Sequence, residues 1–331
     1  MTGLNSRYRS LKAAAGLLLM VMLLVSACGG QVNQSAAGTA TSSTDGIGAE
    51  AAAMRTIQDA YGETSIPASP KRIIVLSTLA LESMLSLGIK PVGAPYSIPD
   101  NAKFFAHLEK QTEGVQNIGT VDQPNLETIA RLNPDLIIAQ KEENEAIYQD
   151  LKRIAPVYMA SGKPNEWKKL FLGHAEALGK QEEGTRLVTA YEQKVAKFQA
   201  DMGSRLNEKT VMLIRPRADH VRLQMQGSFS GSVVAEAGLK RPGAYNASKE
   251  HNIKITEEQI AEMDSDFIIS FGREHEADFF NTKIKTNPVW KTLTAVKNGE
   301  VYYTNWEVWL SGQGIQSANL IIDDLNRIFI K

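Results

Sequence analysis

From residue 72 onward, hydrophobic positions fall into short apolar runs separated by amphipathic segments. Residues 72–77 form one such run, and residues 79–87 then place apolar side chains at helical spacing before Gly88. A second helix is predicted to begin after Asn125, which can cap it, and a buried strand over residues 135–139 follows. Strand, helix and strand at this spacing are typical of a parallel sheet covered by helices, so the pattern predicts an α/β fold.

The same pattern occurs a second time in the chain. Residues 258–269 repeat the order of residues 127–138, with Glu, Ile-Ala, Asp and Ile-Ile matched. Residues 237–240 are similar to residues 87–90, and both segments stand at the predicted end of a helix. Two matches in the same order predict two similar α/β lobes, at residues 57–164 and 208–331.

The segment between the lobes, residues 165–207, is poor in Gly and Pro and rich in Ala, Leu, Glu, Gln and Lys. This composition predicts a long helix, broken near residues 178–180. A helix of about 25 residues would be roughly 37 Å long, enough to bridge two lobes. The lobes would then enclose a ligand cleft between the carboxyl ends of their strands, which is the usual ligand position in α/β sheets.

The first 27 residues have the features of a signal peptide. Arg7, Arg9 and Lys12 precede an apolar run over residues 13–25, which is short for a membrane span. Small residues then lead directly to Cys28, the chain's single cysteine, in a pattern similar to a bacterial lipobox. We therefore expect a lipid anchor on Cys28, a flexible tether over residues 28–56 and a location on the extracytoplasmic face of the cell membrane. A plain signal peptide with an incidental cysteine is the alternative.

Composition narrows the possible functions of the folded part. The 331 residues carry 36 basic and 37 acidic side chains, so no bulk charge recruits nucleic acid. One cysteine excludes a disulfide framework or a thiolate cluster, and the five histidines lack the i, i+4 spacing of a helical zinc site. Residues 227–231 place phenylalanine where a nucleophile elbow needs serine, and no phosphate or dinucleotide fingerprint is found. These observations favour a binding protein without a cofactor over an enzyme.

Two arginines are candidates for ligand binding. Arg215 and Arg217 follow the apolar strand predicted at residues 211–214, and they alternate with Pro216. In an extended chain both guanidinium groups face the same side, where the pair suits a carboxylate or another cluster of anionic oxygens. A salt bridge to one of the many acidic residues is the alternative.

Further candidates stand at other predicted strand ends. Trp306 and Trp309 follow a strand-like segment at residues 301–303, and one of them can form a flat apolar wall. Arg273, Lys141 and Tyr96 also end predicted strands, although each alone is more often a surface residue.

Glu127 and Glu258 occupy the same position in the two repeats, at the start of a helix in each lobe. A carboxylate in the first turn is favoured by the helix dipole. The pair can equally form two docking points for a basic partner. The pattern leaves both interpretations open.

The order of lipobox, tether, lobe, long helix and lobe resembles the substrate-binding lipoproteins of ABC importers for ferric siderophores and vitamin B12. The resemblance covers the chain from about Ile57 and is sharpest at residues 134–139, 147–156, 228–233, 237–242, 298–302 and 318–325. It implies a monomer with the class III periplasmic-binding-protein fold, in which two Rossmann-like lobes are joined by a long rigid helix. These stretches are most similar to the branch that binds hydroxamate and citrate-hydroxamate siderophores.

The resemblance also implies roles for four residues. In that branch, the arginine matching Arg215 and the tryptophan matching Trp309 lie at the ligand. The glutamates matching Glu127 and Glu258 dock onto basic residues of a permease dimer, which works with a cytoplasmic ATPase. The siderophore itself fills the coordination sphere of iron, so the receptor needs outer donors and an aromatic wall rather than metal ligands.

One departure from the branch leaves the ligand open. Many relatives carry a basic residue and a histidine where this chain has residues 141–144, and Glu143 would repel an anionic ligand if it pointed inward. Either the siderophore differs, or Lys141 takes over the contact. Two alternatives remain: the same scaffold binding a corrinoid or haem, with Met225 or His220 as the axial ligand of haem, and a lipid-anchored hydrolase or ferric-siderophore reductase.

Overall fold

The computed structural model describes residues 53–98 and 103–330. The predicted signal peptide, Cys28 and most of the predicted tether lie outside these residues. Strand β1 (Met54–Asp59) begins inside the segment predicted as tether and pairs antiparallel with β2 (Gly62–Pro67). The hairpin is attached to the first lobe, because Ala60 N donates a hydrogen bond to Met159 O at 2.8 Å.

The first lobe contains a five-stranded sheet of order β5-β4-β3-β6-β7, in which all neighbours are parallel. Its strands are β3 (Ile73–Val75), β4 (Gly93–Ala94), β5 (Gln116–Asn117), β6 (Leu136–Gln140) and β7 (Val157–Ala160). Its α-helices are α1 (Thr78–Ser86), α2 (Leu126–Arg131), α3 (Lys141–Asn144) and α4 (Tyr148–Ile154). Every residue of β6 is buried, as expected for a strand covered on both faces.

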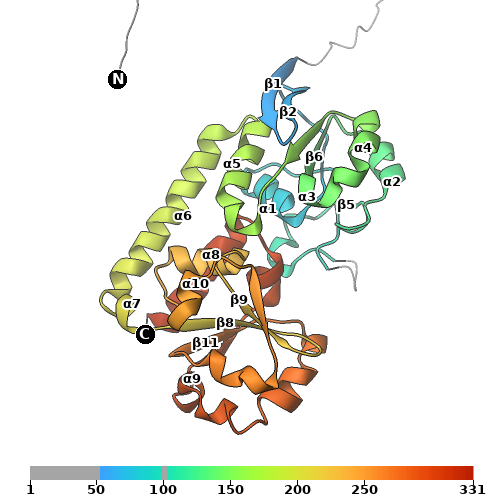
Figure 1. Cartoon of the computed structure of the whole chain (residues 1–331). Coiled ribbons are helices and arrows are strands. Elements are labelled where there is room, and N and C mark those ends of the chain that lie inside the picture. The colour runs from blue at the N-terminus through green and yellow to red at the C-terminus, as the bar shows by residue number, and fades with distance from the viewer. Residues whose placement is uncertain (1–52, 99–102, 331) are drawn as a thin grey trace, which may run out of the picture. The chain divides into compact units, whose positions relative to one another are not determined.

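The helical linker is broken where the sequence predicts. Helix α5 (Trp167–Ala177) and helix α6 (Gln181–Met202) flank Gly179, whose φ of 65° ends the first helix. Helix α6 has 22 residues and is therefore roughly 33 Å long. It packs along α5 and along the last helix, α10 (Ile315–Phe329), as Figure 1 shows. A short helix, α7 (Arg205–Glu208), leads into the second lobe.

The second lobe has a mixed sheet of order β10-β9-β8-β11-β12. Its strands are β8 (Val211–Pro216), β9 (Val221–Gln224), β10 (Asn252–Ile255), β11 (Phe267–Ser270) and β12 (Val301–Tyr303). Strand β9 runs antiparallel to both neighbours, whereas β11 is parallel to β8 and β12. Helices α8 (Phe229–Glu236) and α9 (Thr294–Lys297) belong to this lobe, as do the 3-10 segment η6 (Glu257–Met263) and the π-helical turn η10 (Glu307–Ser311).

The two lobes share local structure where the sequence repeats. Helices α1 and α8 are each followed by a left-handed glycine, Gly88 with φ 73° and Gly238 with φ 83°. Segments α2 and η6 occupy matching places, because each precedes the fourth strand in its sheet order, β6 or β11. The predicted fold of two α/β lobes joined by a long helix is confirmed.

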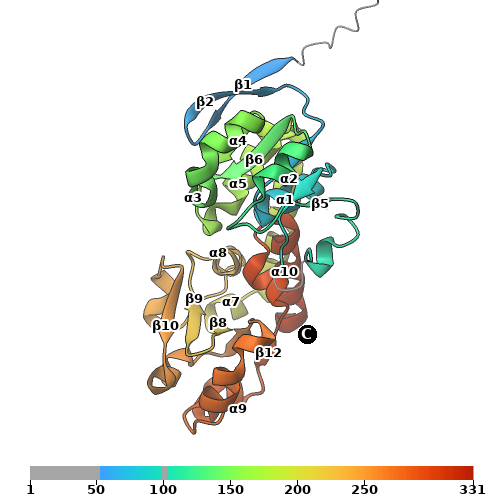
Figure 2. The same cartoon turned by 90° about the vertical axis from the view of Figure 1, so that its right-hand side faces the viewer.

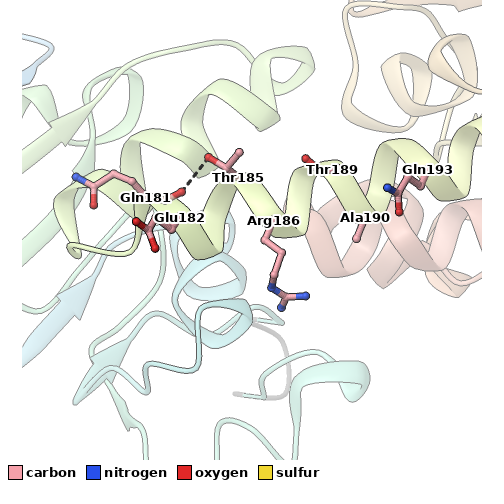
Figure 3. Close-up of a pocket in the computed structure, with 7 residues that line it drawn as sticks. All are labelled: Gln181, Glu182, Thr185, Arg186, Thr189, Ala190 and Gln193. Carbon is pink, nitrogen blue, oxygen red and sulfur yellow. Dashed lines mark hydrogen bonds between the residues drawn. The ribbon is translucent and has the colours of Figure 1, made fainter.

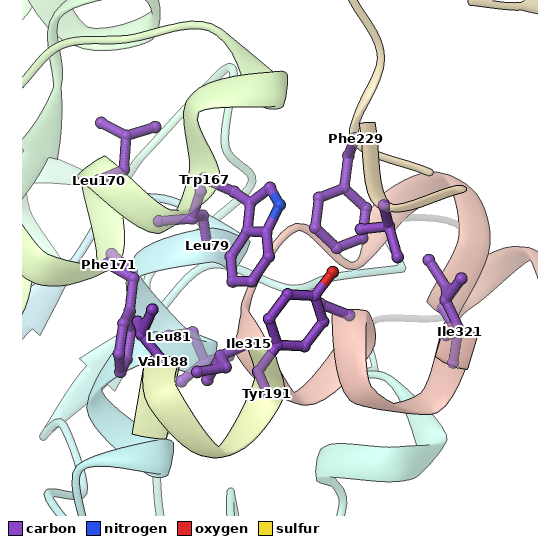
Figure 4. Packing of buried hydrophobic residues seen from close by; sticks show 14 of the residues in the cluster. Leu79, Leu81, Trp167, Leu170, Phe171, Val188, Tyr191, Phe229, Ile315 and Ile321 are labelled. Carbon is purple, nitrogen blue, oxygen red and sulfur yellow. The ribbon is translucent and has the colours of Figure 1, made fainter. Parts of the chain in front are cut away.

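The largest hydrophobic core lies among the helices and includes residues of both lobes. Trp167 packs edge-on against Tyr191 at 5.0 Å and against Phe229 at 6.0 Å between ring centroids (Figure 4). Helix α10 contacts α1, α6 and α8 and lies between the two sheets in Figure 2. A smaller core in each lobe covers the opposite face of its sheet. Among the described residues, no helix combines the length and apolar character that crossing a membrane requires.

Candidate ligand-binding site

Two arginines and one glutamate meet at the end of β8. Arg215 Nη2 lies 3.2 Å from Glu276 Oε2, and Arg217 Nη1 lies 2.6 Å from Glu276 Oε1. The two guanidinium groups therefore face the same side of the chain, as the alternation with Pro216 predicts. Because one carboxylate is shared by two cations, the cluster keeps one uncompensated positive charge.

The environment of Arg215 is only partly polar. Burial is the main cause that lowers the pKa of Arg215; Glu276 opposes this shift and Arg217 adds to it. Its Nε atom is buried and has no hydrogen-bond partner within the described part of the chain. The pKa of His251 is also lowered, first by its own burial and further by Arg222 and Arg215. A buried cation with a spare donor is suited to an anionic ligand.

A pocket of about 560 Å³ opens at the carboxyl ends of β8, β11 and β12. Trp306 lines it, and the Arg273 guanidinium lies 4.8 Å from the centre of the Trp306 ring. Phe105 of the first lobe meets the same indole edge-on at 6.3 Å. Tyr303 lines the pocket with 60 % of its side chain exposed, and Lys285 Nζ lies 4.7 Å from its ring centre. Of the two tryptophans after β12, Trp306 is the one that lines this pocket, and its role as a flat wall for a ligand stays a prediction.

Trp309 does not form this wall. Its side chain has no exposed surface, and its indole Nε1 donates a hydrogen bond to Asp324 Oδ2 in α10 at 2.7 Å. The ring packs 5.6 Å from Phe271 in the core. In this structure η10 turns Trp309 inward, while Trp306, three residues earlier, lines the pocket; a ligand contact of Trp309 stays a prediction.

A second pocket, of about 240 Å³, lies at the carboxyl ends of β3 and β6. Its wall includes Ser77, Thr78, Glu142 and Glu143 from the first lobe and Gln313 from the segment between η10 and α10. The carboxylate of Glu142 already has hydrogen-bond partners within the protein, since it accepts hydrogen bonds from Ser161 Oγ at 2.6 Å and from Gly162 N at 3.1 Å. Glu143 lines the same pocket.

Lys141 lies on another side of the lobe. Its Nζ is 4.9 Å from the centre of the Tyr61 ring in the hairpin and 3.9 Å from Glu145 Oε1. It lines neither of the two pockets, and a ligand contact of Lys141 stays a prediction. Tyr96 follows β4 as predicted, but its ring packs 5.9 Å from Phe104 and also lines neither pocket.

The carboxyl group of Glu143 has an unusual protonation equilibrium. Its side chain is reached by water from the pocket, yet the surrounding protein atoms partly desolvate it. This desolvation, with smaller contributions from Asp122 and Glu142, raises the pKa of Glu143 to about 7.

Glu127 and Glu258 are both exposed. Glu127 is in the first turn of α2, which Asn125 caps by accepting a hydrogen bond from Thr128 N at 2.9 Å. Glu258 is in the first turn of η6, where the Thr256 hydroxyl donates to its carboxylate and lowers its pKa. The geometry is compatible with a helix-end role and with docking.

The proposed axial ligands of haem are occupied. Met225 has no exposed surface. His220 Nδ1 lies 2.5 Å from Asp219 Oδ1, and its Nε2 accepts a hydrogen bond from Arg222 Nε at 3.2 Å. Among the described residues, no group of three or more His, Cys, Asp or Glu side chains could hold a metal ion. Met225 is buried and both ring nitrogens of His220 have partners, so neither is placed to be an axial ligand of haem.

A further hollow runs along the outer face of α6 (Figure 3). The 7 described residues that line it all belong to this one helix, from Gln181 to Gln193. Because no second element contributes a group, no polar atoms converge on a common point there.

Sequence reasoning missed three residues of the site. Glu276 reaches Arg215 from 61 positions away. Phe105 of the first lobe contacts the Trp306 ring, and Gln313, which precedes α10, lines the smaller pocket. Glu276 stands in a segment that resembles a broken zinc motif, and no local pattern marks Phe105 or Gln313. Only the folded chain brings these groups together.

Residues 73–307 match the family model described as periplasmic binding protein. The chain belongs to this family. Periplasmic binding proteins bind a solute and are not enzymes, and the two lobes with their long helix are the class III form of the fold. This periplasmic binding protein is 32% identical over 324 residues to the Bacillus subtilis (strain 168) protein named "Probable siderophore-binding lipoprotein YfiY", with 95% of this chain and 96% of the relative covered.

Two other comparisons are of similar strength. The Fe(3+)-citrate-binding protein YfmC of Bacillus subtilis (strain 168) is 31% identical over 326 residues, which cover 96% of this periplasmic binding protein and 97% of YfmC. The crystal structure of Staphylococcus aureus SirA complexed with staphyloferrin B matches with a TM-score of 0.74 at 31% identity. That match covers 82% of this chain and 97% of SirA.

Proposed function

We propose that this periplasmic binding protein is an extracytoplasmic receptor that captures a ferric siderophore and delivers it to an ABC permease for iron uptake. The observation that carries the proposal is the Arg215–Arg217 pair, which shares the single carboxylate of Glu276 beside the Trp306 wall. Relatives named for siderophore and ferric-citrate binding, at 31–32% identity over nearly the whole chain, support it.

The chemistry of the strand ends suits a preformed iron complex. A siderophore already surrounds iron with hard oxygen donors, so the receptor binds the outside of the complex. Anionic oxygens accept charge-assisted hydrogen bonds from Arg215 and Arg217, and Arg273 with Trp306 offers a flat surface to the rest of the ligand. We assign the ligand to the hydroxamate or carboxylate-hydroxamate class, with carboxylate-bearing complexes preferred.

Delivery requires an anchor and a docking surface. We assign the lipid anchor to Cys28, in keeping with relatives named as lipoproteins. The exposed Glu127 and Glu258, one on each lobe, are assigned to contacts with basic residues of a permease dimer that works with a cytoplasmic ATPase. The receptor acts as a monomer.

The test is a titration of the detergent-solubilised full chain, followed by tryptophan fluorescence. The ligands are ferric schizokinen, ferric aerobactin, ferric citrate, ferrioxamine, a ferric catecholate, haem and cobalamin. We expect saturable quenching by a carboxylate-bearing ferric complex, and a loss of at least about tenfold in affinity in Arg215→Ala. The matched control is Arg186→Ala on the exposed face of α6.

Three results would contradict the proposal. Binding of haem or cobalamin alone would move the protein to the alternative ligand class. Tighter binding of neutral tris-hydroxamates than of carboxylate-bearing complexes would refute the charge argument. Turnover of a bound ferric complex without added reductant would show an enzyme.

A further inference from the structure

The two strand-end surfaces carry opposite charges. The second lobe offers Arg215 and Arg217 against the single carboxylate of Glu276. The first lobe instead offers Glu143, with Asp122 and Glu142 as its charged neighbours. A ligand that touches both surfaces therefore meets a positive wall on one side and a negative wall on the other.

Glu143 has no partner that compensates its charge. Within the described part of the chain it forms no hydrogen bond or ion pair, whereas the neighbouring Glu142 is satisfied by Ser161 and Gly162. Lys141, two residues earlier, points toward Tyr61 and Glu145. The pocket does contain one lysine, Lys163, but its Nζ is not within 4.0 Å of Glu143. The carboxylate thus remains available to a ligand.

The opposite wall of this pocket adds a second available group. The Gln313 amide lines the pocket and makes no hydrogen bond to the rest of the described chain. Its oxygen accepts and its nitrogen donates, so it can complement a donor bound by Glu143. The volume of about 240 Å³ is smaller than that of a site for a whole drug-sized ligand, so it suits one arm of a larger molecule.

The protonation of Glu143 agrees with this arrangement. Its pKa is raised to about 7 because the carboxylate is partly desolvated among like charges. A positive group in the pocket would remove this penalty and favour the ionised form. A second anionic group would increase it.

We infer that the small pocket receives an arm of the ferric siderophore that carries a protonated amine, and that Glu143 selects this arm. The inference rests on the proposed function and names its ligand more closely. The ligand is bipolar: its anionic oxygens lie against Arg215 and Arg217, and its ammonium group binds to Glu143. This polarity also fixes the orientation of the ligand between the lobes, because the reverse orientation would place like charges together.

The test compares two probes that differ by one charge. Ferric desferrioxamine B carries a free terminal ammonium group, and its N-acetyl derivative lacks that charge on the same hydroxamate framework. Dissociation constants are measured by isothermal titration calorimetry with the full chain at pH 8, where Glu143 is mainly ionised. We expect wild type to bind the ammonium form about three- to tenfold more tightly than the acetylated form.

Two variants assign the preference to the pocket. In Glu143→Gln the ratio of the two dissociation constants should fall to about one, because the amide keeps the shape and removes the charge. Glu145→Gln is the matched control, since Glu145 is an exposed glutamate on the Lys141 side of the lobe and outside the pocket. This control should keep the wild-type ratio.

The remaining outcomes separate this inference from the proposed function. A wild-type ratio of one or less, or an unchanged ratio in Glu143→Gln, would overturn the role of Glu143 while leaving siderophore capture intact. If none of these ferric complexes binds, the proposed function fails and the inference fails with it.

Discussion

A buried carboxylate links two helices that are far apart in the sequence. Glu82 of α1 has no exposed surface, and it accepts hydrogen bonds from Ser317 N at 3.0 Å and from Ser317 Oγ at 2.7 Å. Ser317 lies in the first turn of α10, so the charge of Glu82 stands at the positive end of that helix. Gly314 permits the approach, because a Cβ there would lie 2.5 Å from the Glu82 Cβ.

The size of the effect follows from these contacts. In Glu82→Ala the Ser317 amide loses its acceptor, and Ser317 Oγ keeps only its longer contact with His107 Nε2 at 3.3 Å. Each unsatisfied buried group costs about 1–3 kcal/mol. We therefore expect the free energy of unfolding to fall by about 3–5 kcal/mol. In Glu82→Gln one oxygen and the side-chain shape remain, and the loss of charge at α10 should cost about 1–2 kcal/mol.

Thermal unfolding followed by circular dichroism measures this prediction on the ligand-free protein. A loss of about 3 kcal/mol corresponds to a decrease of roughly 6–12 °C in Tm for a domain of this order of size. Glu208→Ala is the control, because Glu208 is exposed on α7 and should shift the free energy by no more than about 0.5 kcal/mol. If Glu82→Ala has the same Tm as this control, the carboxylate does not hold α1 to α10 and the reasoning is refuted.

Three further predictions concern binding and delivery. Affinity for an anionic ferric complex that carries no amine, such as ferric citrate, should fall as the pH rises through about 7, because Glu143, with its raised pKa, becomes negative there. The same titration of Glu143→Gln should be flatter, and an equal slope in both proteins would exclude this group. Glu127→Ala and Glu258→Ala should leave ligand affinity unchanged and abolish uptake by cells, whereas a matching loss of affinity would contradict the docking role. Trp309→Phe should lower the free energy of unfolding by about 1–3 kcal/mol and change ligand affinity less than twofold, since the buried hydrogen bond to the α10 carboxylate and part of the ring packing are lost. For the pH prediction, the charged groups that surround Glu143 are Asp122, Glu142 and Lys163.

The sequence predicts those parts of the fold that local chemistry determines. Asn125 caps α2 as expected, and the left-handed Gly88, Gly179 and Gly238 end helices where the pattern places them. Strand β6 is recognisable because both of its faces are apolar. The antiparallel strand β9 is missed because its four residues carry no turn signal that distinguishes a hairpin from a crossover.

Side-chain direction is the part that the sequence does not determine. Trp306 and Trp309 stand together after β12, and only the π-helical geometry of η10 decides which one is buried. Lys141 directly follows β6 as expected, yet its Nζ lies over the Tyr61 ring of the hairpin, a contact that depends on tertiary packing. The pairing of Arg215 with Glu276 likewise depends on a loop whose position the strand pattern does not encode.

The shared core limits how the lobes can respond to a ligand. One continuous cluster contains Leu81 of α1, Leu213 of β8 and Ile315 of α10, so a wide opening between the lobes would expose apolar side chains that are fully or almost fully buried. Each 100 Å² exposed would cost about 2.5 kcal/mol, in addition to the contacts of Glu82 with Ser317. Large movements of the two lobes relative to each other therefore cost much free energy in this protein. Under the proposed function, we expect ligands to be selected by groups that are already in place at the strand ends, whose opposite charges distinguish ligands by polarity.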